Sequence, residues 1–424
     1  MKKTSNVQRP TPDAQWKRRA WTAIFVLICL TSLRAASAEN SELLAASRPL
    51  QEGVPQVAVL RLRTLLNGNL APADRRAASA KLGEALLAAE EPEEALKVLQ
   101  DPQLSDLPAV RFWRAQAFAS LERWAEALPL YQQITADAAS PFHARALFGQ
   151  GESFRALGRL DEALKRFALL FSDERWKERA ELRSIELLLD KQDNAGARRL
   201  LDKTKPDALA NKKEKRFLQG RLEAQLNHRE RALELFRTIF RRPEGATRAV
   251  LIATLCAAAE TNLQLKTPEA GDDPLEDFIE HYPTDPALPT IFAKLDQLYR
   301  AEPAPSTQEL SRWANDSVQP RRALAQWYLA RSELRAGRSE NASRIFGLLR
   351  REHLKVPALV QGWCEFAQLE IDQERYDEAL AILEEARAAH PPAEVLRQID
   401  LIAGRAQYQA RHFETAARTF EKVA

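Results

Sequence analysis

The sequence has little glycine and cysteine, and it lacks runs of alternating β-branched residues. Its 424 residues include 14 Gly and three Cys, whereas the strong helix formers Ala, Leu, Glu and Arg are abundant. The missing period-two runs argue against β-sheets. Apolar residues make up 45% and charged residues 29% of the chain, which excludes a disordered chain and a multi-span membrane protein. This composition predicts a helical protein.

Cysteine and histidine are too few and too scattered for a disulfide framework or a metal site. Cys256 and Cys364 lie far apart in apolar helical stretches, and the chain contains no CxxC motif. The six histidines do not cluster at the spacings of metal ligands. We therefore expect two buried free thiols, no metal and no cofactor.

The sequence also lacks the motifs of common catalytic sites. It contains no GxxxxGK[ST] phosphate loop, no GxGxxG, no HExxH and no GxSxG. Carboxylate pairs such as Asp272 and Asp273 are common, but a chain with 59 acids is expected to carry such pairs on its solvated faces. These absences predict a protein that is not an enzyme.

The positive charge is concentrated at the N-terminus. Residues 1–38 contain seven Lys or Arg and one acid, and removing them from the totals of 62 bases and 59 acids leaves 55 and 58. A nucleic-acid-binding protein normally keeps a positive stripe in its folded part. Basic clusters such as residues 211–216 (NKKEKR) and Arg241-Arg242 lack interleaved aromatics. We interpret them as loop and helix-end charges, with an acidic partner as the alternative, and expect no nucleic-acid partner.

The first 38 residues have the features of an export signal. Residues 17–19 (KRR) are basic, residues 20–33 form a 14-residue apolar run, and Ala36-Ser37-Ala38 fits the A-x-A cleavage pattern. The run is shorter than the roughly 20 residues of a membrane span. We predict cleavage after Ala38, export to the periplasm or cell envelope, and no membrane span after cleavage. The alternative is an uncleaved segment that anchors the chain to the membrane.

A ten-residue pattern exemplified by GRLDEALKRF (residues 158–167) recurs along the chain. The alanine at its sixth place falls at Ala95, Ala127, Ala163, Ala197, Ala232, Ala342, Ala379 and Ala416. Six of the seven gaps between successive alanines are 32 to 37 residues long, and the remaining gap of 110 equals three repeats. A period near 35 is typical of a repeat array.

The residues around each alanine predict a pair of antiparallel helices. A small or compact residue, such as Gly83, Gly151 or Gly220, stands twelve places before the alanine, and a large one, such as Phe167 or Phe236, stands four places after it. Small residues let the two helices approach, and the large ones fill the space beside them. Acids such as Asp161 and Glu162 begin the second helix, where its dipole is positive.

These spacings resemble the tetratricopeptide repeat family over roughly residues 76–424. In GQGESFRALGRLDEALKRF, the matching residues are Gly151, Phe154, Gly158, Ala163 and Phe167. The resemblance implies an all-α, right-handed superhelical solenoid of antiparallel helix pairs, with about nine or ten units. Within residues 266–290, FIEHYPTDP is similar to the unit ending of bacterial envelope proteins of this family.

The departures from the pattern define the expected organisation. We expect a degenerate first helical unit at residues 39–75, a regular array at 76–265, irregular units at 266–320 and a further array at 321–424. In the irregular part Pro274 replaces the alanine, and Trp313 is the candidate large residue. The sequence stops at Ala424 inside an expected helix, and solenoids end in a polar cap. We therefore expect the array to be truncated there, and the alternative is that a partner covers the last helix.

In the tetratricopeptide family the first helix of each unit lines a concave groove. We therefore expect groove residues on the first helix, close to the small residue that stands twelve places before each repeated alanine. Aromatics three places before it and polar residues one place after it suit an extended peptide or a partner helix. The alternative is that the aromatics pack between neighbouring units. The candidate groove residues are Phe112, Gln116, Phe148, Glu152, Phe217, Arg221, Trp327, Arg331 and Arg405.

The export signal and the repeats together predict a non-enzymatic protein-interaction scaffold of the bacterial cell envelope. Its expected partner is a protein or peptide held in the groove. The alternative is the helical scaffold part of a larger envelope enzyme, such as a murein-cleaving lytic enzyme, with a catalytic domain beyond residue 424. Fold alone does not decide between these.

Overall fold

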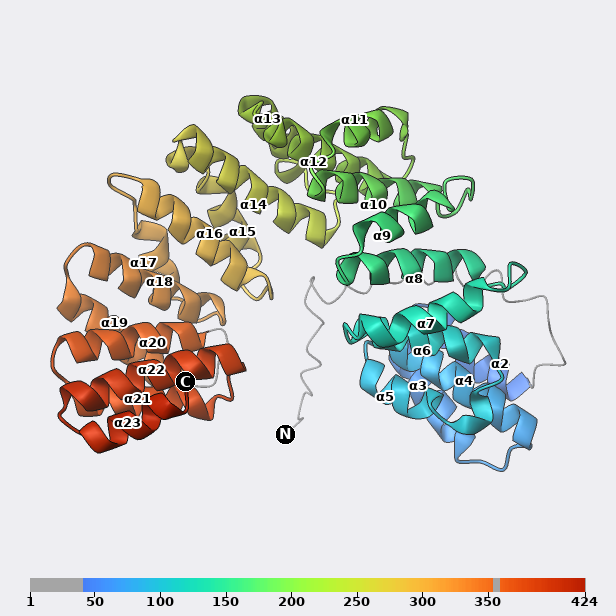
Figure 1. Cartoon of the computed structure of the whole chain (residues 1–424), viewed down its shortest axis with the longest axis horizontal. Coiled ribbons are helices and arrows are strands. Elements are labelled where there is room, and N and C mark those ends of the chain that lie inside the picture. The colour runs from blue at the N-terminus through green and yellow to red at the C-terminus, as the bar shows by residue number, and fades with distance from the viewer. Residues whose placement is uncertain (1–40, 354–358, 424) are drawn as a thin grey trace, which may run out of the picture. The chain divides into compact units, whose positions relative to one another are not determined.

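The computed structural model describes residues 41–353 and 359–423 (Figure 1). These residues form 22 α-helices and two short 3-10 helices, and no strand occurs among them. The predicted all-α helical repeat fold is therefore confirmed. The predicted signal segment and its cleavage site at Ala38 lie outside the described residues.

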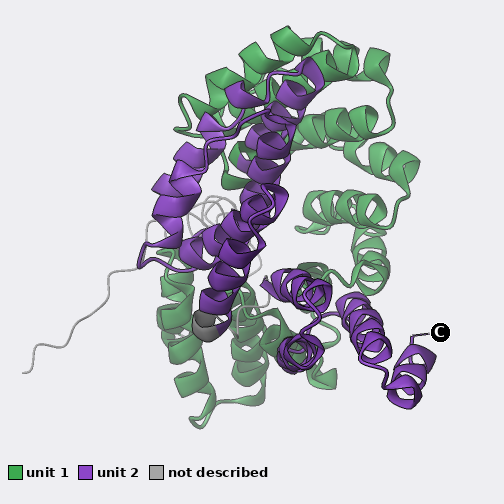
Figure 2. Ribbon diagram, turned by 90° about the vertical axis from the view of Figure 1, so that its left-hand side faces the viewer, with its two compact units in different colours: residues 1–251 green, residues 252–424 purple. Residues whose placement is uncertain are grey.

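The chain divides into two compact units, Met1–Leu251 and Ile252–Ala424 (Figure 2). Unit 1 contains, in chain order, α2 (Ser41–Gln51), α3 (Pro55–Leu66), α4 (Pro72–Ala88), α5 (Pro92–Leu99), η1 (Pro102–Leu104), α6 (Pro108–Ser120), α7 (Trp124–Thr135), α8 (His143–Ala156), α9 (Leu160–Ala168), α10 (Lys177–Asp190), α11 (Asn194–Lys203), α12 (Leu209–Gln225) and α13 (Arg229–Phe240). Helix α14 (Arg248–Leu265) begins in unit 1 and continues in unit 2.

Unit 2 contains the remaining helices. They are η2 (Pro268–Ala270), α15 (Asp273–His281), α16 (Leu288–Ala301), α17 (Gln308–Ala314), α18 (Arg321–Arg335), α19 (Ser339–His353), α20 (Val360–Asp372), α21 (Tyr376–Ala388), α22 (Ala393–Gln409) and α23 (Phe413–Glu421).

The helices pack in consecutive pairs. Helices α6 and α7, α8 and α9, and α12 and α13 pack in unit 1, and α18 and α19, α20 and α21, and α22 and α23 pack in unit 2. We call the earlier helix of each pair the first helix and the later one the second helix. First helices also pack on one another, as α4 does on α6 and α16 on α18. The 22 described helices are enough for eleven units of two helices, against the nine or ten units expected from the sequence.

The repeated alanines are the points of closest approach within the pairs. All eight are at most 1% exposed. A Cβ atom added to Gly151 would lie 2.4 Å from the ring of Phe167, and one added to Gly220 would lie 2.3 Å from the ring of Phe236. The small residues of the first helices therefore make room for the large residues of the second helices, as the spacing predicts. Phe420 differs from its buried counterparts because it is 38% exposed.

The turn between the two helices of a pair has a repeated backbone conformation. The first residue of each motif copy has a φ between 58° and 74°, at Glu90, Glu122, Gly158, Gln192, Asn227, Gly337, Glu374 and Arg411. In the copy at Gly158, the backbone N–H of Arg159 donates to the carbonyl of Phe154 at 2.8 Å. This left-handed residue and its hydrogen bond end the first helix and start the second.

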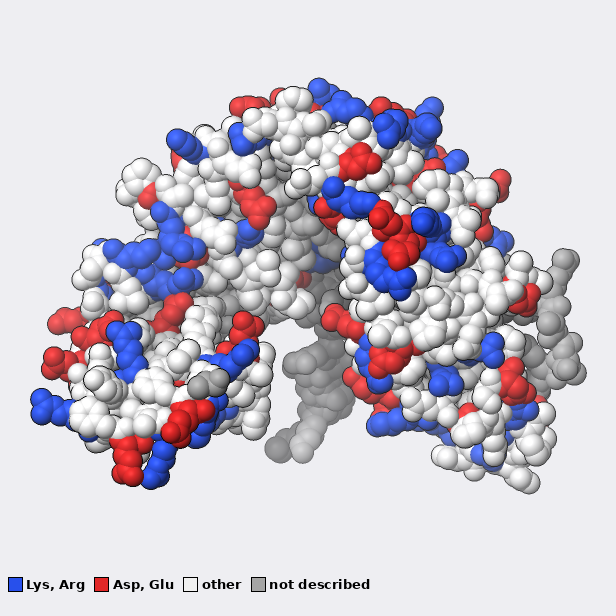
Figure 3. Space-filling view, viewed as in Figure 1, with Lys and Arg blue, Asp and Glu red and all other residues white. Residues whose placement is uncertain are grey.

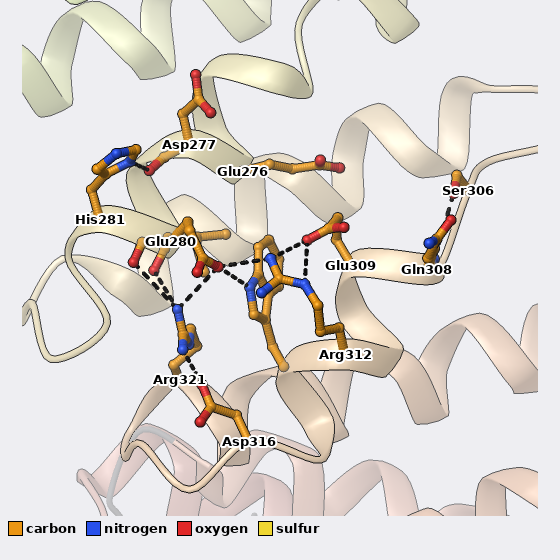
Figure 4. A network of polar contacts seen from close by, with 12 residues as sticks. Glu276, Asp277, Glu280, His281, Ser306, Gln308, Glu309, Arg312, Asp316 and Arg321 are labelled. Atoms are coloured by element: carbon orange, nitrogen blue, oxygen red, sulfur yellow. Dashed lines mark hydrogen bonds and ion pairs between the residues drawn. The ribbon is translucent and has the colours of Figure 1, made fainter.

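A polar network joins the short helices of the irregular part of unit 2 (Figure 4). One carboxylate oxygen of Glu280 accepts hydrogen bonds from Arg312 at 2.8 Å and from the Nε1–H of Trp313 at 2.7 Å. Arg321, which is 6% exposed, forms an ion pair with the same oxygen at 3.2 Å and another with Asp316. The indole of Trp313 is completely buried. These contacts connect α15, α17 and the start of α18.

Candidate interaction groove

Unit 2 has a groove on three of its first helices, α16, α18 and α20. Its volume is about 420 Å³. The lining residues carry three guanidinium groups, two carboxylates, one amide and two leucine side chains: Arg300, Arg331, Leu334, Arg335, Glu365, Gln368, Leu369 and Asp372. The groove is therefore amphipathic and contains charges of both signs.

Helical spacing places the lining residues of α18 and α20 on one face of each helix. Arg331, Leu334 and Arg335 are three and four residues apart on α18, and Glu365, Leu369 and Asp372 follow the same spacing on α20. Residues at these separations lie above one another on a helix surface. The sequence of each helix thus presents a continuous stripe toward the groove.

A buried carboxylate anchors the arginines. Asp296 on α16 is 3% exposed, and its two oxygens form ion pairs with Arg331 at 3.0 Å, Arg335 at 2.8 Å and Arg300 at 3.4 Å. A buried carboxylate needs such partners, because removing its charge from water is costly. Asp296 therefore holds three guanidinium groups at the edge of the groove.

Glu365 and the neighbouring aromatic rings complete the surroundings of Arg331. Glu365 accepts a hydrogen bond from Trp327 Nε1–H at 3.0 Å and forms an ion pair with Arg331 at 3.2 Å. Burial raises the pKa of the Glu365 carboxyl group. The Arg331 guanidinium also lies 5.4 Å from the centre of the Tyr328 ring, a favourable cation–π distance. Arg331 is thus held in position before any partner binds.

This arrangement suits an extended segment with polar and apolar side chains. Guanidinium groups donate paired hydrogen bonds to carboxylates and carbonyl groups. Leu334 and Leu369 offer apolar surface beside them. The three arginines are accompanied by three acids, Asp296, Glu365 and Asp372, so the charges of the groove nearly balance.

The structure places the predicted residues of unit 2 at or near this groove. Arg331 lines it. Arg405 on α22 is exposed and donates to the side-chain oxygen of Gln368, a lining residue, at 3.3 Å. Trp327 is 6% exposed and its indole packs beside Gly362. Trp327 therefore supports the groove from behind, which favours the packing alternative for this residue.

The predicted aromatic residues of unit 1 also pack between helices. Phe112 is 3% exposed and stacks on Phe142, with ring centres 4.8 Å apart. Phe148 is half-buried, 5.1 Å from the Trp176 ring, and Phe217 is half-buried, 6.1 Å from the Phe236 ring. The interior needs these rings to fill the space between pairs, so Phe112 does not line an open groove.

The predicted polar residues of unit 1 make contacts inside and between repeats. The Gln116 amide donates to the Tyr131 hydroxyl at 2.5 Å. Glu152 on α8 forms an ion pair with Arg183 on α10 at 3.4 Å. Arg221 on α12 forms one with Asp190 on α10 at 2.8 Å. Glu152 and Arg221 therefore connect successive first helices, whereas Gln116 bonds to the second helix of its own pair, and the three residues lie on three different first helices.

Sequence reasoning missed several residues of the groove, above all Asp296, Arg300 and Arg335. Asp296 stands 35 residues before Arg331, which is one repeat period. The alanine that marks the register is missing in the unit of Asp296, so the sequence pattern does not show that Asp296 and Arg331 occupy equivalent positions. Arg335 follows Arg331 by four residues on the same helix, and this spacing is a signal that could have identified it.

Other chemical features are few in the described part of the chain. No group of three or more His, Cys, Asp or Glu residues there could hold a metal ion. Cys364 is buried and Cys256 is half-buried, and both are free thiols. None of the helices in residues 41–353 and 359–423 has the length and apolar character needed to cross a membrane.

Comparisons with known proteins identify the repeat. The sequence model of the tetratricopeptide repeat matches residues 110–171. These residues include most of α6 and all of α7, α8 and α9. No curated protein matches the chain.

Two solved structures are similar in part. One is a tetratricopeptide repeat protein from Parabacteroides merdae, with 16% identity, a TM-score of 0.49, and coverage of 61% of this chain and 98% of that chain. The other is the APC/C heterotetramer Cut9–Hcn1, with 17% identity, a TM-score of 0.41, and coverage of 95% of this chain and 74% of that chain.

Proposed function

Because the chain is a protein of the tetratricopeptide repeat superfamily, we propose that it is a protein-interaction scaffold of the bacterial cell envelope. Its groove on α16, α18 and α20 binds a peptide segment or a partner helix. The observation that carries this proposal is the set of oriented arginines beside two leucines on three successive first helices. Oriented arginines beside apolar side chains in a preformed concave site are typical of peptide recognition.

The envelope location rests on the N-terminal segment. Its basic residues, 14-residue apolar run and Ala36-Ser37-Ala38 pattern are those of a secretory signal. N-terminal sequencing of the chain recovered from the periplasm is expected to give Glu39 as the first residue. Recovery of a chain that starts at Met1 and fractionates with membranes would contradict cleavage and favour the anchored alternative.

Site-specific crosslinking tests the groove. A photoreactive amino acid at Gln368 in the full chain, expressed in its native cells, is expected to capture a defined partner. The same amino acid at the exposed residue Lys97 is the matched control. Arg335→Ala, which truncates an exposed arginine of the groove, is expected to lower the crosslinked yield at Gln368 about tenfold, the effect of about 1.4 kcal/mol.

The outcome of this experiment is decisive when helicity is checked in parallel. An unchanged yield in the Arg335→Ala chain, with a circular dichroism spectrum equal to that of the parent, would rule out the groove as the binding site. Equal capture of the partner at Gln368 and Lys97 would also rule out the groove as the binding site, because the partner would then contact both surfaces equally.

A further inference from the structure

The region of α11 to α13 in unit 1 carries a large excess of positive charge. Residues 191–248 contain 16 Lys or Arg and eight Asp or Glu, although the chain after residue 38 is slightly acidic as a whole. On the face drawn in Figure 3, side chains of both signs are spread over the two units, and Lys and Arg also gather over α11. Residues 191–248 therefore carry a net positive charge, whereas the rest of the chain after residue 38 carries a net negative charge.

Part of this charge is used inside the fold. Arg221 is paired with Asp190 at 2.8 Å, and Arg198 is paired with Glu223 at 3.3 Å. Lys215 donates to the carbonyl of Thr204 at 2.6 Å. These cations hold α10, α11 and α12 together and are not available to a partner.

Five other cations lie in the N-terminal half of α12 and directly after the end of α13. Two of them reach from α12 to the end of α13. Lys213 Nζ donates to the carbonyl oxygens of Thr238 at 3.3 Å and of Arg242 at 2.5 Å. Arg216 donates to the Thr238 hydroxyl at 3.4 Å. We define the basic surface as Lys212, Lys213, Arg216, Arg241 and Arg242. No ion pair joins any of these five to an acid in the described residues, and four of them are exposed.

The positive charges of the basic surface are poorly compensated. Burial lowers the pKa of the Lys213 ammonium group, and Arg216 and Arg242 lower it further, while Glu244 alone among the neighbouring acids opposes them. Glu214, the acid within residues 211–216, is instead paired with Arg183 at 2.7 Å. A negatively charged partner would relieve this repulsion.

The chemistry of the basic surface favours an acidic protein segment over nucleic acid or membrane. Phe217 is half-buried and Phe236 is fully buried, so neither ring is presented for stacking on bases. Leu209 is the one exposed large apolar residue of the two described helices α12 and α13. Its side chain packs against the loop at Gly245 and does not provide the apolar face that inserts into lipid.

We propose that the basic surface docks an Asp/Glu-rich segment of a protein partner. It lies in unit 1, whereas the groove of the proposed function lies in unit 2, so the two can fail independently. Five cations on the ends of two adjacent helices match a short acidic stretch. Such contacts mainly speed association and select the partner, and they weaken with salt.

Fluorescence anisotropy with the full chain tests this proposal. The probe is a fluorescein-labelled peptide of alternating Asp and Glu. The chain is expected to bind it at low ionic strength and to lose affinity as NaCl is added. The variant Lys212→Glu/Arg241→Glu/Arg242→Glu changes exposed residues only and is expected to bind the peptide at least about tenfold more weakly.

A matched control variant distinguishes the effect of the basic surface from the effect of the net charge of the chain. The variant Lys97→Glu/Lys165→Glu/Arg418→Glu has the same change in charge at exposed residues elsewhere and is expected to bind within about twofold of the parent. Equal losses in the two variants, or no loss in the first, would overturn the proposal. Tighter binding of a short DNA duplex or of phosphatidylglycerol vesicles by the same residues would also overturn it, as would salt-sensitive self-association that displaces the peptide.

Discussion

At the turn between the two helices of a pair, one residue repeatedly adopts a left-handed backbone conformation. Glycine occupies this position at Gly158 and Gly337, but Glu, Gln, Asn and Arg occupy it in the other copies. A residue with a Cβ atom pays about 1 kcal/mol or more for this conformation, whereas glycine does not. The repeat therefore tolerates local strain because packing of the two helices determines the turn.

Exchanging residues at this turn is expected to change stability in opposite directions. Glu122→Gly relieves the strain and should stabilise unit 1 by about 0.5–1 kcal/mol, whereas Gly158→Ala introduces it and should destabilise by about 1 kcal/mol. No atom lies within 4 Å of a Cβ added to Gly158, so the second effect is conformational and not steric. Urea denaturation measures both, and shifts of the same sign would contradict this explanation.

At the scale of the element, ion pairs join several first helices to the next first helix. Arg183 on α10 contacts Glu152 on α8 and Glu214 on α12, and Arg331 on α18 contacts Asp296 on α16 and Glu365 on α20. The surface that could receive a partner is thus also the surface that sets the spacing of the repeats. Changes in the groove should therefore affect both binding and stability.

Removing the charge of Asp296 is expected to destabilise unit 2. Asp296→Asn leaves Arg300, Arg331 and Arg335 to repel one another without their shared carboxylate. Losing a partner of a buried pair costs about 3–5 kcal/mol, but these guanidiniums are partly exposed, so we expect about 1–3 kcal/mol. Asp190→Asn, which removes one exposed ion pair, is the control and should cost less than about 1 kcal/mol. Equal effects in chemical denaturation would contradict the role of Asp296.

A group of carboxylates around the end of α16 predicts a pH dependence. Burial and the charges of Asp272, Glu269 and Glu276 raise the pKa of Glu302 to about 7. The folded chain therefore keeps a proton that the unfolded chain releases at lower pH, and stability falls as the pH rises from about 4.5 through 7.

Substitution of Glu302 tests the sign of this effect. Glu302→Gln should raise the melting temperature at pH 8, where the parent carries the unfavourable charge, and leave it nearly unchanged at pH 4.5. A stabilisation of the same size at both pH values would show that the ionisation of Glu302 is not the cause.

At the scale of the whole molecule, most helices contact their neighbours in the chain, and several first helices also contact the next first helix. Stability in such an array is close to a sum of terms from each repeat and its adjacent repeats. A change in one repeat is therefore felt mainly by the repeats beside it.

A core substitution is therefore expected to have a local effect. Phe167→Ala removes a fully buried ring from α9 and should destabilise this region by about 3–5 kcal/mol. Hydrogen–deuterium exchange should accelerate in α8, α9 and α10 and remain unchanged in α20 to α23. Equal acceleration in both regions would indicate that the chain unfolds as one cooperative body.

The amino-acid sequence by itself determined the helix pairs, because the spacing of alanine, glycine and large apolar residues acts within about 20 neighbouring residues. The eight buried alanines and the contact of Gly151 with Phe167 confirm that interpretation. Where Pro274 interrupts the pattern, the register of the following first helix was lost, and Asp296 was overlooked with it.

Only the tertiary structure decided which side chains remain accessible. Phe112 and Trp327 each lie four residues before a polar candidate on the same helix, Gln116 and Arg331. Packing between repeats nevertheless buries both rings. The groove of unit 2 arises from three helices whose lining residues are 30 to 72 positions apart. Such contacts depend on how one repeat stacks on the next, and no pattern within a single repeat encodes them.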